Sequence, residues 1–289
     1  MRRIVAGAHG PQPVEVPDPA PAAAGELIVA VAFAGVNGVD ALRVAAGEGT
    51  ELGIEFSGTV LDAGAGARFA PGDAVMGLTT GGAMSERLTI DASQCLPVPA
   101  WLGLERAAAF CENFAVAVDA VDQAAPGPDD RCLVRGATGG IGSAIVAVLR
   151  LAGHRVHGLG RADVVAAEPV WDRIFECVGP ALLPDDLERA APQARILVLG
   201  ALGGTTTPLD GMTLMRNRLT VTGTTLSGRA PEEKAAILAR AAERVLPAVR
   251  DGEIELAPAA VFPLDAVSDA LAEYGRSGRR GKVLVAVGG

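Results

Sequence analysis

A glycine-rich turn between an apolar strand and an apolar helix constrains this chain more than any other feature. The stretch CLVRGATGGIGSAIVAVLRLAGHRV covers residues 132–156. Its first residues suit a buried parallel strand, and the residues from about 140 onward read as a long apolar helix. The glycines between them permit a tight turn and let backbone N–H groups approach a pyrophosphate at the positive end of the helix. With a second strand at 155–159, the pattern predicts the first unit of a dinucleotide-binding fold; the alternative is a glycine turn that binds nothing.

Eight residues are candidates for cofactor binding. Six lie in the turn, one ends an apolar strand at 194–200, and one follows the strand at 155–159; they are Gly136, Thr138, Gly139, Gly140, Ile141, Gly142, Gly200 and Arg161. An arginine at 161 favours the 2′-phosphate of NADPH over the ribose 2′-hydroxyl of NADH, although Asp163 weakens that preference. The alternative is a solvent-facing arginine on a short loop.

Composition bounds the remaining possibilities. The 289 residues are 49% hydrophobic and 20% charged, which is enough for one large domain or two ordinary ones. A net charge of −9 argues against nucleic acid and anionic membranes as partners. No apolar stretch has the length of a membrane span or a signal peptide, so we expect a cytoplasmic protein. The four cysteines form no CxxC pair and the three histidines are not at metal-ligand spacing, so we expect reduced thiols and no zinc site.

The order of predicted elements suggests two kinds of structure in one chain. Residues 1–100 alternate short apolar runs with Gly, Pro and Asp, which is typical of a small barrel or sandwich. A helix is predicted over 104–121, then the glycine-turn unit, strands at 194–200 and 218–224, and a helix over 231–252. The tail reads strand, helix, strand.

At this point the chain resembles the medium-chain dehydrogenase/reductase superfamily, in its zinc-independent quinone oxidoreductase and enoyl reductase branch. The likeness covers nearly the whole chain. It rests on GVNGVDALRVAAG (35–47), GIEFSGTV (53–60), APGDAVMGL (70–78), GGAMSE (81–86), GATGGIG (136–142), ARILVLGALGG (194–204) and the tail FPLDAVSDALAEYGRSGRRGKVLVAV.

The resemblance implies an α/β fold: a GroES-like β-barrel domain over 1–105, completed by 250–289, and a Rossmann domain, a doubly wound parallel sheet, over 106–249. It also implies NADPH, hydride transfer between the two domains, a small apolar substrate, and a homodimer formed through the edge strand at 219–223. Asn37 and Ile54 stand where the alcohol dehydrogenase branch has a cysteine and a histidine that bind zinc, so no metal is expected.

Two departures from the family pattern stand out. Only ten residues separate Gly160 from Trp171, where the family has a helix, a strand and a second helix. A parallel crossover needs a dozen or more residues, so we expect a truncated Rossmann domain that lacks about two helices and one strand, with a reduced adenosine pocket. The family's tyrosine and threonine near the nicotinamide are also missing: Val116 aligns with the threonine, and Tyr274 lies far away in the sequence.

Four residues are catalytic candidates: Asn37, Asp40, Glu112 and Asn113. Glu112 would act as a general acid or base with a pKa raised by apolar surroundings, and Asn113 would polarise a carbonyl; alternatively both sit on the solvated end of a helix. Asn37 would donate a hydrogen bond beside the nicotinamide, or it forms a turn. The resemblance places Glu55 in a mostly structural role. Lys282 belongs to a basic run that either approaches the cofactor or forms a solvated face.

Three functions remain open. The first is an NADPH-dependent reductase of an activated C=C bond in an enone, quinone or enoyl thioester, as in bacterial secondary metabolism. The second is a non-redox cyclase, isomerase or dehydratase acting on a polyketide-type substrate with an impaired cofactor site. The third is a binding or structural role without catalysis. An NADPH titration separates the first two.

Overall fold

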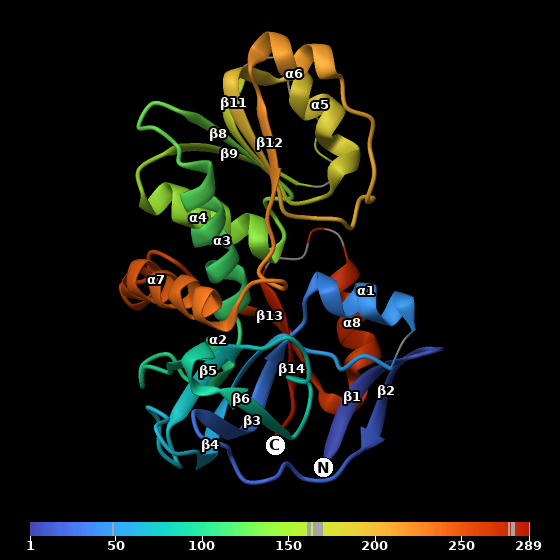
Figure 1. Cartoon of the computed structure of the whole chain (residues 1–289), viewed down its shortest axis with the longest axis vertical. Helices are drawn as coiled ribbons and strands as arrows, with labels where there is room; N and C mark the ends of the chain where they lie inside the picture. The colour runs from blue at the N-terminus through green and yellow to red at the C-terminus, as the bar shows by residue number, and fades with distance from the viewer. Residues whose placement is uncertain (48, 161–162, 164–169, 277, 279–280, 289) are drawn as a thin grey trace. The chain divides into compact units, whose positions relative to one another are not determined.

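The computed structural model describes residues 1–47, 49–160, 163, 170–276, 278 and 281–288. The chain divides into two compact units (Figure 1). Unit 1 consists of Met1–Glu112 together with Arg229–Gly289, and unit 2 consists of Asn113–Gly228. The first unit is therefore assembled from two segments that are far apart in the sequence.

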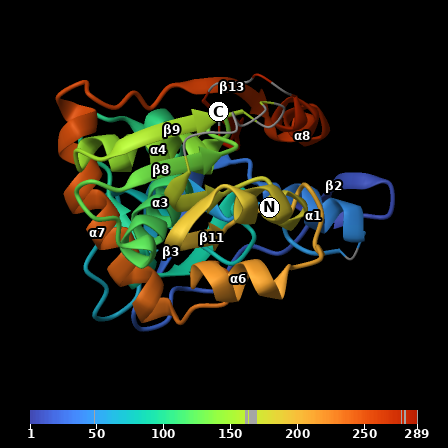
Figure 2. The ribbon, with the colours of Figure 1, turned by 90° about the horizontal axis from the view of Figure 1, so that it is seen from above.

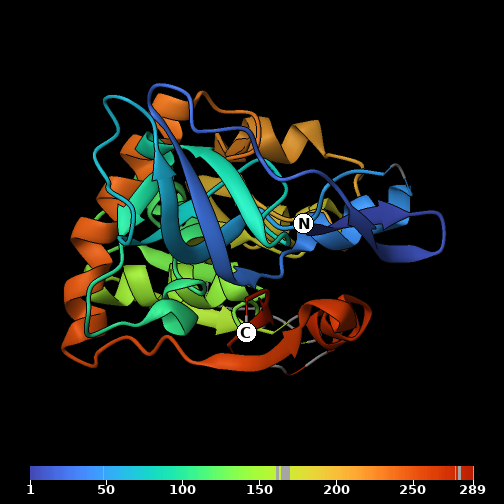
Figure 3. The ribbon, with the colours of Figure 1, turned by 90° about the horizontal axis from the view of Figure 1, so that it is seen from below.

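Unit 1 is built on a sheet that has seven strands in the described part of the chain, in the order β13-β14-β3-β4-β5-β7, with β6 also paired to β3. A two-stranded β1–β2 sheet lies beside it. The strands are β1 (Arg2–Gly7), β2 (Gly10–Glu15), β3 (Glu26–Gly35), β4 (Glu55–Ala63), β5 (Ala74–Leu78), β6 (Arg87–Asp91), β7 (Cys95–Pro97), β13 (Pro258–Pro263) and β14 (Lys282–Ala286). The helices are α1 (Gly38–Ala46), α2 (Leu104–Ala107), α7 (Pro231–Arg250) and α8 (Val267–Gly275). Figure 3 shows the β1–β2 hairpin in dark blue and α8 in red.

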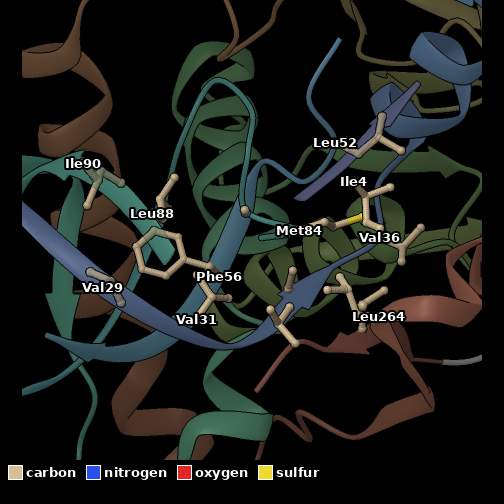
Figure 4. Close-up of a cluster of buried hydrophobic side chains, with 14 of the residues drawn as sticks. Ile4, Val29, Val31, Val36, Leu52, Phe56, Met84, Leu88, Ile90 and Leu264 are labelled. Atoms are coloured by element: carbon tan, nitrogen blue, oxygen red, sulfur yellow. The ribbon is translucent and has the colours of Figure 1, made fainter. Parts of the chain in front are cut away.

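Strand β3 organises this unit. Its sequence ELIVAVAFAG is nearly all apolar, which suits a strand with neighbours on both edges. Its first half pairs with β6 and its last residues pair with β14, while β4 lies along the other edge. The C-terminal strand β14 is thereby joined to a strand from the start of the chain. Figure 4 shows Phe56, from β4, and Met84 among the aliphatic side chains of the core beneath this sheet.

Unit 2 is a parallel sheet with helices. Its described strands follow the order β12-β11-β10-β8-β9, and every pair is parallel. They are β8 (Arg131–Arg135), β9 (Arg155–Leu159), β10 (Trp171–Glu176), β11 (Ala190–Val198) and β12 (Thr220–Gly223). The helices are α3 (Cys111–Ala124, whose first two residues belong to unit 1), α4 (Gly140–Leu151), α5 (Leu183–Glu188) and α6 (Gly211–Asn217). Helix α4 packs on β8 and β9, and α6 packs on β11 (Figure 2).

The predicted α/β class is confirmed, and so are β9, the start of α4 and the strand–helix–strand tail. The predicted helix over 104–121 is confirmed except at residues 108–110, where the chain turns and divides it into α2 and α3. In that turn, the backbone N–H of Phe110 donates to the carbonyl of Ala107, a tighter step than an α-helix makes. Helix α1 was not anticipated from the sequence, and β11 begins at Ala190, four residues before the predicted strand.

The strand order of the described sheet can be compared with that of a complete dinucleotide-binding sheet. A complete dinucleotide-binding sheet has the order 3-2-1-4-5-6, and the order seen here matches it without strand 3. Between β9 and β10 the described residues Gly160, Asp163 and Val170 lie in no helix or strand, and the other residues of that link fall outside the described part. Strand β9 is therefore an edge of the described sheet.

Two further expectations meet the structure. None of the helices in the described residues combines the length and the apolar character that a membrane span requires. All four cysteines are free thiols: Cys95, Cys111 and Cys132 are buried, and Cys177 is partly buried.

Gly142 allows the closest approach in the glycine turn and gives a test of the fold. A Cβ atom at this position would lie 2.2 Å from the carbonyl oxygen of Gly136. We expect Gly142→Ala to lower the free energy of unfolding by about 1–3 kcal/mol, since neighbouring backbone would have to move. The control is Gly211→Ala at the start of α6, where a Cβ meets no atom within 4 Å and stability should stay equal or rise. Denaturant unfolding followed by circular dichroism measures the stability of both variants. A Gly142→Ala variant as stable as the native protein would contradict the close packing of the turn.

Candidate active site

Three strands of unit 1 bring a buried polar cluster together. Strand β3 ends at Gly35, β4 begins at Glu55 and β14 begins at Lys282. Because β3 lies between β4 and β14, these ends meet, and Asn37 follows two residues after β3. The Asn37 amide donates to Glu55 Oε1 at 3.0 Å, and Lys282 Nζ donates to Asn37 Oδ1 at 2.6 Å and forms an ion pair with Glu55. All three side chains are buried.

Glycine at position 35 is a requirement of this cluster. A Cβ on Gly35 would lie 2.3 Å from Glu55 Oε1, so any other residue would push the carboxylate away. The second N–H of the Asn37 amide donates to the Gly35 carbonyl at 3.2 Å. Both donor hydrogens of Asn37 are therefore engaged within unit 1. Its predicted role as a donor in catalysis stays a prediction.

Asp40 fixes the start of α1. Its carboxylate accepts hydrogen bonds from the backbone N–H of Asn37 at 2.9 Å and of Gly53 at 2.8 Å. Complete burial raises its pKa, and these two hydrogen bonds act against that rise. Since each oxygen has a backbone partner, the observed role of Asp40 is to join helix α1 to the loop before β4.

Glu55 also reaches the first turn of α3. Its Oε2 accepts the backbone N–H of Glu112 at 3.0 Å, so a buried carboxylate lies at the positive end of this helix. That contact ties the main chain of Glu112 to the cluster of Asn37, Glu55 and Lys282.

The carboxyl group of Glu112 differs from the other two carboxylates. Glu55 and Asp40 have hydrogen-bond partners for both oxygens, whereas the Glu112 carboxyl makes no hydrogen bond to the described residues. Glu112 as a whole residue is half-buried. Burial among protein atoms, followed by the negative charge of Glu55, raises the pKa of Glu112 to about 7, while Lys282 partly offsets that rise. Glu112 is thus a carboxyl poised near neutral pH with oxygens available to another molecule.

The glycine turn of unit 2 joins β8 to α4. Gly136 adopts a left-handed φ of 72°, and Gly142 packs against the backbone of Gly136. Thr138 is exposed, and Gly139, Gly140 and Ile141 are half-buried at the start of the twelve-residue helix α4. Half-buried glycine backbone at the positive end of a helix fits the pyrophosphate of a dinucleotide, because glycine has no side chain of its own to keep the phosphates away. The structure therefore brings six of the eight predicted cofactor residues into one accessible turn.

Asn113 belongs to this turn rather than to the cluster around Glu112. A Cβ on Gly140 would lie 2.9 Å from Asn113 Oδ1, so the buried carboxamide packs directly against the first residue of α4. The adjacent residues Glu112 and Asn113 therefore serve different groups, one in each unit.

The two remaining predicted cofactor residues lie elsewhere. Gly200 follows β11, where a Cβ would lie 2.2 Å from the carbonyl oxygen of Cys177. It thus sits at the carboxyl edge of the parallel sheet, as the glycine turn does. Arg161 lies outside the described residues, whereas the Asp163 carboxylate accepts the N–H of Gly160 at 2.7 Å, just beyond β9.

Sequence reasoning undervalued Glu55 and Lys282. Lys282 was read as one of a run of basic residues, but its side chain is only 4% exposed and pairs with Glu55, so it does not form a solvated face. The available signal was a lysine that directly precedes the apolar run VLVAV and so begins a buried strand. In the described residues, no group of three or more His, Cys, Asp or Glu side chains is arranged to hold a metal ion.

Comparisons with known proteins agree with this architecture. Residues 23–100 match the alcohol dehydrogenase GroES-like domain family, and residues 151–285 match the zinc-binding dehydrogenase family. The quinone oxidoreductase-like protein 2 of Rattus norvegicus is 27% identical over 315 aligned positions, covering 96% of this chain and 89% of the rat protein. Since 96% of 289 residues spans 315 positions, the rat protein has residues that this chain lacks.

Two further proteins show the same likeness. The acrylyl-CoA reductase of Ruegeria pomeroyi is 28% identical over 226 positions, covering 64% of this chain and 68% of its own. The quinone oxidoreductase of Thermus thermophilus, which has been solved with NADPH, superposes with a TM-score of 0.81 at 25% identity, covering 99% of this chain and all of that one. The paired GroES-like and parallel-sheet units, the glycine turn and these relatives together show that this chain belongs to the medium-chain dehydrogenase/reductase superfamily of oxidoreductases.

Proposed function

We propose that this protein is an NADPH-dependent reductase of an activated C=C bond, with Glu112 as the residue that supplies the proton. The single observation that carries the proposal is the Glu112 carboxyl, which has a pKa of about 7 and no internal hydrogen bond among the described residues. The glycine turn supports the cofactor, and the likeness to proteins named quinone oxidoreductase and acrylyl-CoA reductase supports the class of substrate.

Reduction of an enone, a quinone or an enoyl thioester needs one hydride and one proton for each double bond. Bound NADPH supplies the hydride, and the chain must supply the proton and hold the substrate. A general acid works best when its pKa lies near the working pH, because it is then both protonated and ready to give up the proton. Glu112 meets that condition. Asp40 is a poorer candidate for a different reason, since both of its oxygens already accept backbone hydrogen bonds.

The buried cluster acts on Glu112 in two ways. The contact between Glu55 Oε2 and the Glu112 N–H fixes the start of α3, so the acid has a defined position. The charge of Glu55 favours the protonated form of Glu112, while Lys282 limits that effect. Asn37 forms hydrogen bonds with both Glu55 and Lys282 and so fixes their positions; it is a positioning residue in this scheme.

A non-redox cyclase, isomerase or dehydratase is the second candidate. The observation in its favour is that Glu112 and the groups that set its pKa all belong to unit 1, so acid–base chemistry there does not require the glycine turn. Such an enzyme would turn over a polyketide-type substrate without a nicotinamide cofactor.

Cofactor dependence tests the proposal directly. We expect saturable NADPH binding in a fluorescence titration, and oxidation of NADPH when small enones, quinones or enoyl thioesters are added. Thr138→Asp is expected to weaken that binding, because it adds a negative charge to the exposed turn that would receive the pyrophosphate. Conversion of a substrate at the same rate with and without NADPH would favour the second candidate.

Glu112 provides the second test. Reduction by the native protein should slow as the pH rises through about 7, because the carboxyl loses the proton that it must donate. Glu112→Gln should lower kcat by about 100-fold or more and abolish that pH dependence, with NADPH affinity unchanged. The matched control is Glu105→Gln, an exposed carboxylate on α2. A variant at position 112 that keeps the native pH profile would rule out the assigned role.

The role of Glu55 can be read from the same profile. Its negative charge raises the pKa of Glu112, so Glu55→Gln should lower that pKa and move the fall in activity to lower pH. Circular dichroism at each pH checks that the variant is folded, because Lys282 then remains buried without its carboxylate. An unchanged or upward-shifted profile in a folded variant would show that Glu55 does not set the acidity of Glu112.

A further inference from the structure

A second buried ionic cluster lies in unit 2, at the carboxyl edge of the parallel sheet. Arg135 is the last residue of β8 and directly precedes Gly136, the first glycine of the turn. Glu176 is the last residue of the neighbouring strand β10, and Asp185 and Asp186 lie in the first turn of α5. Glu176 and Asp186 are fully buried, and Arg135 is 5% exposed.

Two carboxylate oxygens of this cluster have no hydrogen-bond partner. Arg135 Nε donates to Asp186 Oδ1 at 2.6 Å, and Arg135 Nη2 pairs with Asp185. Glu176 Oε1 accepts the backbone N–H of Val178 at 2.5 Å and of Gly179 at 2.9 Å. Glu176 Oε2 and Asp186 Oδ2 are buried and have no hydrogen-bond partner when both groups are treated as carboxylates.

Keeping Glu176 and Asp186 both ionised in this buried site would cost free energy, because their negative charges repel each other. Arg135 supplies one positive charge, and Asp185 takes one of its hydrogen bonds. Glu176 Oε2 lies 3.7 Å from Arg135 Nε, beyond hydrogen-bond length. Two ionised carboxylates would then share one arginine in a buried site, each with an unsatisfied oxygen. The two side chains are within hydrogen-bonding reach of each other, so one proton would make one of them the donor and the other the acceptor.

We propose that Glu176 and Asp186 share one proton at neutral pH, and that this proton positions the loop after β10, which packs against the glycine turn that would receive the cofactor's pyrophosphate. Burial, opposed by Arg135 and reinforced by Glu176, raises the pKa of Asp186 to about 7. The pKa of Glu176 is also raised, chiefly by burial.

Glu176 holds the loop after β10 against the glycine turn. Its carboxylate fixes Val178 and Gly179, and its carbonyl accepts the N–H of Leu199 at 2.9 Å, at the end of β11. A Cβ on Gly136 would lie 3.3 Å from the side chain of Val178, so the loop and the turn are in contact. A shift of Glu176 would therefore move the surface beside the pyrophosphate site.

The charged groups that face the pair set the effect of pH. They are Arg135 from β8, Asp185 from α5 and Arg189, which directly follows α5. The Cys177 thiol that follows Glu176 is neutral, because burial raises its pKa. With the shared proton, Arg135, Asp185 and the pair carry one net negative charge together; release of that proton to solvent adds another. The added charge next to the glycine turn disfavours a bound phosphate, so alkaline pH should weaken NADPH binding.

Infrared difference spectroscopy tests the shared proton without any cofactor. At neutral pH, native protein minus Glu176→Gln should show the carbonyl band of a protonated carboxylic acid, and native minus Asp186→Asn should show the same band. Both amide variants can keep the hydrogen bond between the two side chains, so they should fold. The matched control is Glu188→Gln, an exposed carboxylate on the same helix, which should show only a carboxylate band. Absence of the acid band from both difference spectra overturns the proposal.

The pH dependence of thermal stability gives a second test of the shared proton. The folded pKa of Asp186 exceeds the ordinary value of 3.8, so the folded protein binds the extra proton and stability falls as the pH rises from about 4 to about 7. Groups with lowered pKa values act in the opposite direction, so the test compares variants. Between pH 4 and pH 7 the Tm of Glu176→Gln should change more favourably than that of the native protein and of Glu188→Gln; equal changes in all three would contradict the shared proton.

A measurement of NADPH affinity against pH tests the positioning role, and it rests on the proposed NADPH-dependent function. The NADPH Kd of the native protein should rise roughly tenfold between pH 6 and pH 8, while that of Glu176→Gln should stay nearly constant. The same rise in both proteins would overturn the positioning role. If NADPH does not bind at all, the proposed function fails, and the infrared and unfolding results still decide the shared proton.

Discussion

The ion pair between Lys282 and Glu55 is the interaction on which unit 1 depends. It joins the last strand of the chain to β4, and Asn37 bridges the two side chains. Desolvation makes a buried ion pair a weak source of net stability, yet loss of one partner is costly because the other charge is left unpaired. The pair therefore acts mainly by fixing geometry: it sets where β3, β4 and β14 meet, and through Glu55 it fixes the first turn of α3.

Two carboxyl systems with raised pKa values follow from a shared principle. Glu112 in unit 1 and the Glu176–Asp186 pair in unit 2 each combine burial with a nearby like charge, and a basic residue in each case limits the rise. They differ in what their oxygens do. Glu112 has none engaged among the described residues, which suits exchange of a proton with a substrate, whereas the pair is enclosed and suits a positioning role.

Sequence reasoning succeeded where structure is local and failed where it is not. The glycine turn and helix α4 were predicted because glycine spacing and apolar periodicity act over a few neighbouring residues. The break between α2 and α3 was missed because Ala108–Phe110 have ordinary helix propensity, and only tertiary packing turns the chain there. The partners of Lys282 were missed because Asn37 is 245 residues away, and no periodicity reports a contact at that separation.

The short link between β9 and β10 leaves the surroundings of the glycine turn intact. Strand β8 keeps neighbours on both edges, so the glycine turn at its end is still held by β9, β10 and α4. In a complete dinucleotide-binding sheet a further strand pairs with the outer edge of the strand that corresponds to β9, on the side where an adenosine ribose is recognised. The described residues contain no such strand. If the proposed NADPH-dependent reaction holds, we expect a large share of the cofactor affinity to come from the pyrophosphate. The groups that would hold it are the backbone at Gly136–Gly142, with the charge balance of Arg135, Glu176 and Asp186 beside it.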